Sequence, residues 1–114
     1  MDQLAEETDV NAELAQTVRS EVEKYVGQSD TSHLYPVFDS ENHQYCVITV
    51  RHHPTRLAPR VVVMARLIGN KIIIEEDTTD KPLVDALMVN AHVPREQIIL
   101  AYAGEKLPET NVEE

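Results

Sequence analysis

The segment that most limits the fold runs from Lys71 to Leu107. Its sequence is KIIIEEDTTDKPLVDALMVNAHVPREQIILAYAGEKL. The pattern predicts a strand at 71–75, a helix, a proline turn and a second strand at 98–102, because both ends are rich in β-branched residues. Thr78 or Thr79 is suited to cap the helix, since a short side-chain oxygen satisfies free backbone amides.

A second helix is expected near the amino terminus, at about 9–26. Gly27 follows it and suits the left-handed conformation that ends many helices. Thr8 or Asp9 can cap its first turn. Apolar residues recur at every fourth position, which places them in one stripe along a helix: Val10, Leu14, Val18, Val22 and Val26.

Three further strands are expected between the helices, at 33–38, 43–51 and 60–68. Pro36 cannot donate to a strand ladder, so the first of them is expected at an edge or with a kink. Gly69-Asn70 forms a two-residue turn that joins 60–68 to 71–75 as a hairpin.

The predicted order is α-β-β-β-β-α-β in a single domain over residues 1–114. It indicates an α+β fold, with a mainly antiparallel sheet of about five strands and two helices. Residues 1–8 and 104–114 are expected to be mobile tails. The strands are apolar on both faces. Two helices on opposite sides would cover both faces, whereas two helices on one side would leave a face for a partner subunit, and the sequence leaves this choice open.

The chain has 114 residues and a formal net charge of −10, with Cys46 as its only cysteine. The charge is −6 over 1–30, +3 over 31–74 and −7 over 75–114. Such an acidic protein repels phosphate backbones at long range, so direct binding of nucleic acid is not expected. A single cysteine favours a reducing compartment, and no apolar run is long enough for a membrane span, so the prediction is a cytoplasmic protein away from the membrane.

The sequence carries little that resembles a reactive centre. His52-His53 is the most tempting metal-binding pair, but zinc needs three or four converging ligands, and adjacent residues usually point apart. Cys46 alternates with Ile48 and Val50, which favours a buried packing thiol over a nucleophile. Neither a phosphate-binding glycine loop nor a hydrolase motif occurs in the sequence. We therefore expect no enzyme activity, no catalytic residues, no metal and no cofactor.

The basic residues of the middle segment are the best candidates for a partner contact, because arginine pairs well with carboxylates and phosphates. An alternative is that they neutralise the protein's own acids. The candidate residues are Arg51, His52, His53, Arg56, Arg60 and Arg66.

Three stretches together resemble one known family. KIIIEEDTTDKPLVDAL, VPREQIILAYAGEKLPE and the upstream FDSENHQYCVITV are similar to the XisI-like proteins, called fdxN element excision controlling factors. The family commonly has Gly-Val-Pro where this chain has His92-Val93-Pro94. A histidine there is expected to adopt the left-handed conformation that glycine takes freely.

The resemblance implies a non-catalytic accessory protein. The family is associated with excision of a DNA element during cyanobacterial cell differentiation, where a separate recombinase exchanges the strands. The implied partner is an XisH-like, nuclease-like protein or another recombination protein. Two alternatives stay open: a DNA-binding accessory that uses the basic 51–66 region, and an uncharacterised metal-assisted enzyme.

Overall fold

The computed structural model describes residues 11–52 and 58–108. It contains two α-helices, six strands and two short 3₁₀ helices. In chain order these are α2 (Ala12–Glu23), β1 (Gly27–Gln28), β2 (Ser32–Asp39), β3 (Gln44–Arg51), β4 (Arg60–Ile68), β5 (Lys71–Asp77), α3 (Leu83–Val89), η1 (Arg95–Gln97), β6 (Ile98–Leu100) and η2 (Ala101–Ala103).

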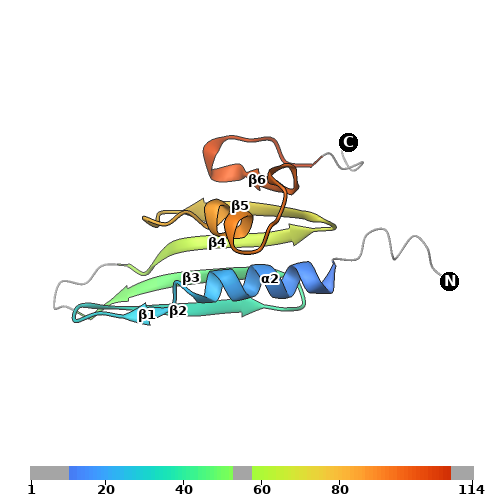
Figure 1. Cartoon of the computed structure of the whole chain (residues 1–114). Coiled ribbons are helices and arrows are strands. Elements are labelled where there is room, and N and C mark those ends of the chain that lie inside the picture. Colours follow the sequence, from blue (N-terminus) through green and yellow to red (C-terminus); the bar gives the residue numbers. More distant parts are fainter. Residues whose placement is uncertain (1–10, 53–57, 109–114) are drawn as a thin grey trace.

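The six strands form one sheet in the order β1-β2-β3-β4-β5-β6 (Figure 1). Neighbours from β1 to β5 are antiparallel, and β6 runs parallel to β5 after the α3 crossover. The α+β class and the mainly antiparallel sheet are therefore confirmed. The sheet has one strand more than expected. The additional strand is β1, whose residues Gly27 and Gln28 pair with β2. The hairpin at Gly69-Asn70 is present, and Gly69 has a φ of 57°.

Helix α2 begins later than the sequence suggested. Asn11 is its cap, and its side-chain oxygen accepts hydrogen bonds from the backbone nitrogens of Glu13 and Leu14 at 2.9 and 3.1 Å. The expected caps, Thr8 and Asp9, lie outside the described residues. Gly27 starts β1 and does not take the left-handed conformation. The helix ends at Glu23 rather than near residue 26, and Gly27 pairs with Leu34 of β2 instead.

Helix α3 begins later than a cap at Thr78 or Thr79 would allow, and neither threonine is its cap. Asp77, at the end of β5, caps it from a distance. One carboxylate oxygen accepts from the backbone nitrogen of Leu83 at 2.7 Å, and the other accepts from the backbone nitrogen of Thr79 at 2.9 Å. Pro82 precedes the helix in an extended conformation, with a ψ of 138°, so helical geometry begins only at Leu83.

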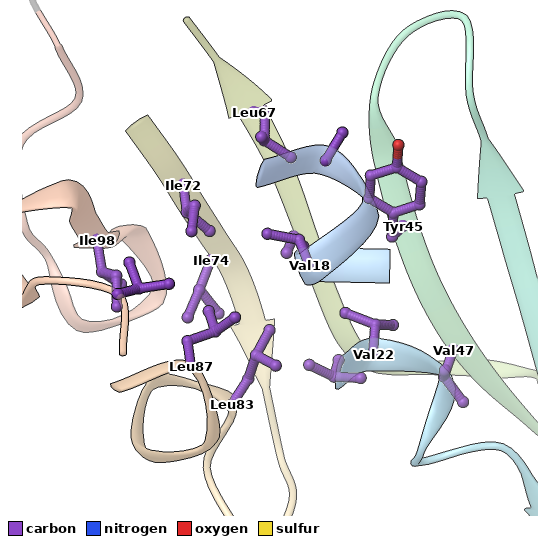
Figure 2. Close-up of a cluster of buried hydrophobic side chains, with 14 residues drawn as sticks. Val18, Val22, Tyr45, Val47, Leu67, Ile72, Ile74, Leu83, Leu87 and Ile98 are labelled. Atoms are coloured by element: carbon purple, nitrogen blue, oxygen red, sulfur yellow. The ribbon is translucent and has the colours of Figure 1, made fainter. Parts of the chain in front are cut away.

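Both helices pack on the same face of the sheet. In Figure 1 they lie in front of the strands, with α2 in blue and α3 in orange. Their apolar stripes join the side chains of one sheet face in a single core (Figure 2). The opposite face has no helical cover within residues 11–52 and 58–108, which answers the question that the sequence left open. The buried core residues are Ala15, Val18, Val22, Tyr45, Val47, Val63, Ala65, Leu67, Ile72, Ile74, Leu83, Leu87, Val93 and Ile98.

The chain after β6 is tied back to the sheet. Gly104 adopts a φ of 92°, and the Glu105 carboxylate accepts hydrogen bonds from the Leu100 backbone nitrogen at 2.9 Å and from Arg95 at 2.7 Å. These bonds hold the first residues of the segment that was predicted as a tail. Residues 1–8 and 109–114 fall outside the described part of the chain. Among the helices that the structure describes, none is long and apolar enough to cross a membrane.

Candidate functional surfaces

The sheet face that carries no helix exposes several apolar side chains in the described part of the chain. We call it the open face. Strand pairing places Tyr35 opposite Ile48 and Val37 opposite Cys46 on this face, and Val61 of β4 pairs with Ile48. Tyr35, Val37 and Val61 retain 39%, 49% and 38% of their surface exposed. Exposed apolar side chains gathered on one face are typical of a contact surface for another protein.

Cys46 lies on the open face, opposite Val37 of β2, and is the buried thiol that the sequence predicted. It is buried because neighbouring strand side chains surround it. Burial raises the pKa of the Cys46 thiol. A thiol with a raised pKa is protonated at neutral pH and is a poor nucleophile, which agrees with a packing role.

The strand register divides the predicted basic residues between the two faces. Arg66 projects on the open face, where its Nε lies 2.5 Å from a carboxylate oxygen of Glu75. Both side chains are about 30% exposed. Arg66 is thus neutralised by an acid of its own chain, as the alternative interpretation anticipated.

Arg51 and Arg60 lie on the other face, at the end of the sheet. Arg51 pairs with Ser32 of β2, and Arg60 of β4 pairs with Thr49 of β3. Thr49 and Arg51 alternate with the buried Val47, so all four residues belong to the helix-side face. They line one hollow of about 140 Å³ together with Ala58.

Neither of these two arginines is ion-paired with a carboxylate in the described part of the chain. The hollow is therefore lined by two arginines and two hydroxyl-bearing residues, without a neutralising acid among its described lining residues. Such donors match an anion, since arginine offers several N–H groups in a fixed fork and hydroxyls add further donors.

His52 turns away from its neighbour Arg51. Its backbone nitrogen donates to the Thr31 carbonyl at 2.8 Å, and its ring meets His33 edge-on with 6.1 Å between centroids. His33 in turn stacks on Tyr35 at 4.1 Å. His53 and Arg56, also predicted as contact residues, lie outside the described residues. Over 11–52 and 58–108, no three His, Cys, Asp or Glu side chains are grouped as a metal site would need.

Ser32 and Thr49 were not foreseen as members of a site. Each is an ordinary strand residue in the sequence, and nothing in its local pattern marks it. The pairing register of β2, β3 and β4 brings them beside the arginines. Register depends on contacts between segments far apart in the chain, so a single sequence contains no local signal for it.

Solved structures with the same fold come from Anabaena variabilis. An XisI-like protein of that organism aligns with a TM-score of 0.68 and 22% identity, covering 78% of this chain and 84% of its own. The fdxN element excision controlling factor XisI of the same organism aligns with a TM-score of 0.66 and 24% identity, covering 80% of this chain and 90% of its own. None of the curated proteins matches the chain.

The sequence itself carries the family signature over almost its full length. The family model described as XisI protein matches residues 1–111. This range includes both helices and all six strands of the sheet, together with the hollow and the open face. The chain therefore belongs to the XisI family.

Proposed function

We propose that this protein is a non-catalytic accessory factor that controls excision of a DNA element by binding an XisH-like partner protein. It would act in the cytoplasm, where its single cysteine stays reduced. Membership of the XisI family supports the link to excision, because a structurally similar member is named an fdxN element excision controlling factor.

The open face is the observation that carries the partner-binding part of the proposal. A half-buried apolar sheet surface facing water is unfavourable, at roughly 25 cal/mol for each Å² of apolar surface left exposed. Tyr35, Val37 and Val61 are exposed on this face, and Ile48 and Met64 are only partly buried there. Covering these side chains with a protein would release that cost, and aromatic anchors such as Tyr35 are typical of interface centres.

The charge of the chain favours a particular kind of partner. With a net charge of −10, the molecule attracts basic proteins at long range and repels acidic ones. Proteins that act on DNA commonly carry basic surfaces for its phosphates. Charge complementarity would thus accelerate encounter with a DNA-acting partner, and the apolar open face would hold the complex.

Co-purification from the native host tests the proposal. The wild-type chain is expected to retain an XisH-like protein, and Val37→Lys is expected to lose it, because a charge would then be buried in the interface without a partner. Val89→Lys is the matched control. Val89 is 71% exposed on α3, on the side of the sheet that carries the helices.

Retention of the partner by Val89→Lys and its loss from Val37→Lys would support the open face as the binding surface. If wild-type protein retains no XisH-like protein, the specific proposal is wrong. If both variants retain the partner equally, the binding surface lies elsewhere. Unchanged thermal unfolding of both variants is needed to exclude a folding defect as the cause.

A further inference from the structure

We propose that the hollow between Arg51 and Arg60 is a binding site for a single phosphate group carried by a small molecule. The site is independent of the open face and does not rest on the proposed partner. It lies at the end of the sheet on the helix-side face, beyond the part of that face that the core fills.

Three neighbouring strands build the site. Ser32 comes from β2, Thr49 and Arg51 from β3, and Arg60 from β4. The pairs Ser32–Arg51 and Thr49–Arg60 are held in register by the sheet ladder, so their Cα positions are set by backbone hydrogen bonds. Groups placed on paired strands need little reorganisation to meet a ligand.

The charge balance makes this arrangement unusual for the chain. Acids outnumber bases by 20 to 10, yet two of the bases line one hollow where no acid is among the described lining residues. Arg66, Arg95 and Lys24 each pair with a carboxylate. Two unpaired like charges close together repel, and a bound anion would remove that repulsion.

The donors fit a phosphate group in particular. Two guanidinium groups can each give two parallel N–H bonds to phosphate oxygens. The Thr49 hydroxyl adds a donor. Ser32 Oγ lies 3.1 Å from Ser29 Oγ and can accept that hydrogen bond while it donates its own hydrogen to the ligand.

The hollow and the charge of the molecule favour a small ligand over a nucleic acid. A volume of about 140 Å³ is close to that of one phosphate group with a few waters or attached atoms, since water occupies about 30 Å³ in the liquid. A polymer would also bring many phosphates toward a protein of net charge −10. A single phosphate group is repelled less, because salt screens it from acids that lie beyond a Debye length while its short-range hydrogen bonds remain.

Titration of the ¹⁵N-labelled chain with inorganic phosphate at constant ionic strength tests the proposal. The expected result is a saturable shift of the backbone amide signals of Ser32, Thr49, Arg51 and Arg60. Arg60→Gln is expected to weaken binding by about tenfold or more, because it removes charge-assisted hydrogen bonds. The double variant Arg51→Lys with Arg60→Lys is expected to weaken it as well, although the charge is kept, because the fork geometry is lost.

Lys106→Gln is the matched control, since it removes the same charge from an exposed residue that follows β6 at the other edge of the sheet. It is expected to leave phosphate binding unchanged. If Lys106→Gln weakened phosphate binding equally, or if sodium chloride alone gave identical shifts, the effect would reflect nonspecific electrostatics. Either result would overturn the proposed site.

A short DNA duplex forms the second arm of the experiment. At the salt concentration where phosphate binds, the duplex is expected to leave the four amide signals in place. Stronger shifts from the duplex than from phosphate would overturn the small-molecule proposal in favour of a nucleic-acid contact. Circular dichroism and thermal unfolding of each variant separate loss of binding from loss of folding.

Discussion

Two histidines hold the left-handed conformation that glycine normally occupies. His92 has a φ of 58° and His43 a φ of 54°. The sequence predicted the conformation of His92, because relatives commonly have glycine before Val-Pro, and this prediction is confirmed. It did not predict that of His43, which turns the chain between β2 and β3. A side chain in this region costs free energy because Cβ approaches the following carbonyl oxygen.

Replacing His92 by glycine should stabilise the protein. Relief of the left-handed strain, roughly 1–2 kcal/mol, is at least as large as the added entropy of an unfolded glycine, roughly 0.5–1 kcal/mol, so a gain of up to about 1.5 kcal/mol in the free energy of unfolding is expected. His92→Val should destabilise, since β-branched residues tolerate this conformation poorly. Urea unfolding measures both changes.

His52→Gly is the control, because His52 is an exposed residue whose φ is not positive. It should bring no gain in stability. If His92→Val were as stable as wild type, the left-handed conformation at residue 92 would be in error.

Acid should weaken the tie formed by Glu105. The backbone hydrogen bond from Leu100, followed by the bond from Arg95, holds the pKa of this carboxyl below its usual value of 4.5. Because the folded-state pKa is lowered, the contribution to stability is present above about pH 4.5 and is lost as the pH falls through the folded-state pKa.

Glu105→Gln removes this titration. The free energy of unfolding of the variant is therefore expected to fall less steeply than that of wild type as the pH drops below about 4.5. Urea unfolding at neutral and acidic pH gives the two slopes. Parallel curves for variant and wild type would show that Glu105 is not linked to folding.

At the scale of elements, helix α3 shows how a cap can come from outside the local pattern. Thr78 and Thr79 have the side chains and the position of caps, but Asp77 performs the role because its carboxylate reaches past five residues to Leu83. The same carboxylate accepts from the Thr79 hydroxyl at 2.6 Å. One acid thus joins the end of β5 to the start of α3 and fixes the strand-to-helix turn.

Asp77→Ala should destabilise the protein by about 1–2 kcal/mol, because the Leu83 and Thr79 amides would lose their acceptor. Asp80→Ala is the control. Asp80 is exposed in the same turn. Its loss should cost less than about 0.5 kcal/mol, as for most exposed substitutions.

Chemical denaturation of the two variants under identical conditions compares them directly. An equal or larger loss for Asp80→Ala would contradict the role of the Asp77 carboxylate as the cap of α3.

At the scale of the whole molecule, the placement of both helices on one face determines which surface is available for binding another protein. The open face exposes Tyr35, Val37 and Val61, while Arg66 and Glu75 neutralise each other on the same surface. Strand β1 pairs only with His33 and Leu34, so the rest of β2 lies at the sheet edge. That part contains Pro36, which lacks an N–H and discourages strand addition. Association is therefore expected through the face rather than through this edge.

In the absence of a partner, a second copy of the chain is expected to cover the open face. Light scattering after gel filtration should then show a concentration-dependent dimer for wild type and a monomer for Val37→Lys, since a two-fold interface would bury the new charge twice. Equal masses for both proteins would contradict this. An XisH-like partner that uses the same face should dissociate the dimer on binding.

The sequence by itself determined the type and order of nearly every element, because hydrophobic periods of 3.6 and 2 are local properties. The strand at Arg60–Ile68, the Gly69 turn and the buried Val18 and Val22 all follow from short stretches of sequence. The left-handed His92 was expected only from the resemblance to the XisI-like proteins. The family signature was also readable in the segment from Lys71 to Leu107 and its upstream strand.

Only the tertiary structure decided which face is covered and which residues meet. The strands are apolar on both sides, so periodicity cannot choose between the faces, and the choice depends on how two helices far apart in the chain pack together. Strand register then separates Arg66 from Arg51 and Arg60, and brings Ser32 and Thr49 beside the latter two. These outcomes depend on contacts between residues far apart in the chain, so no local stretch of sequence predicts them.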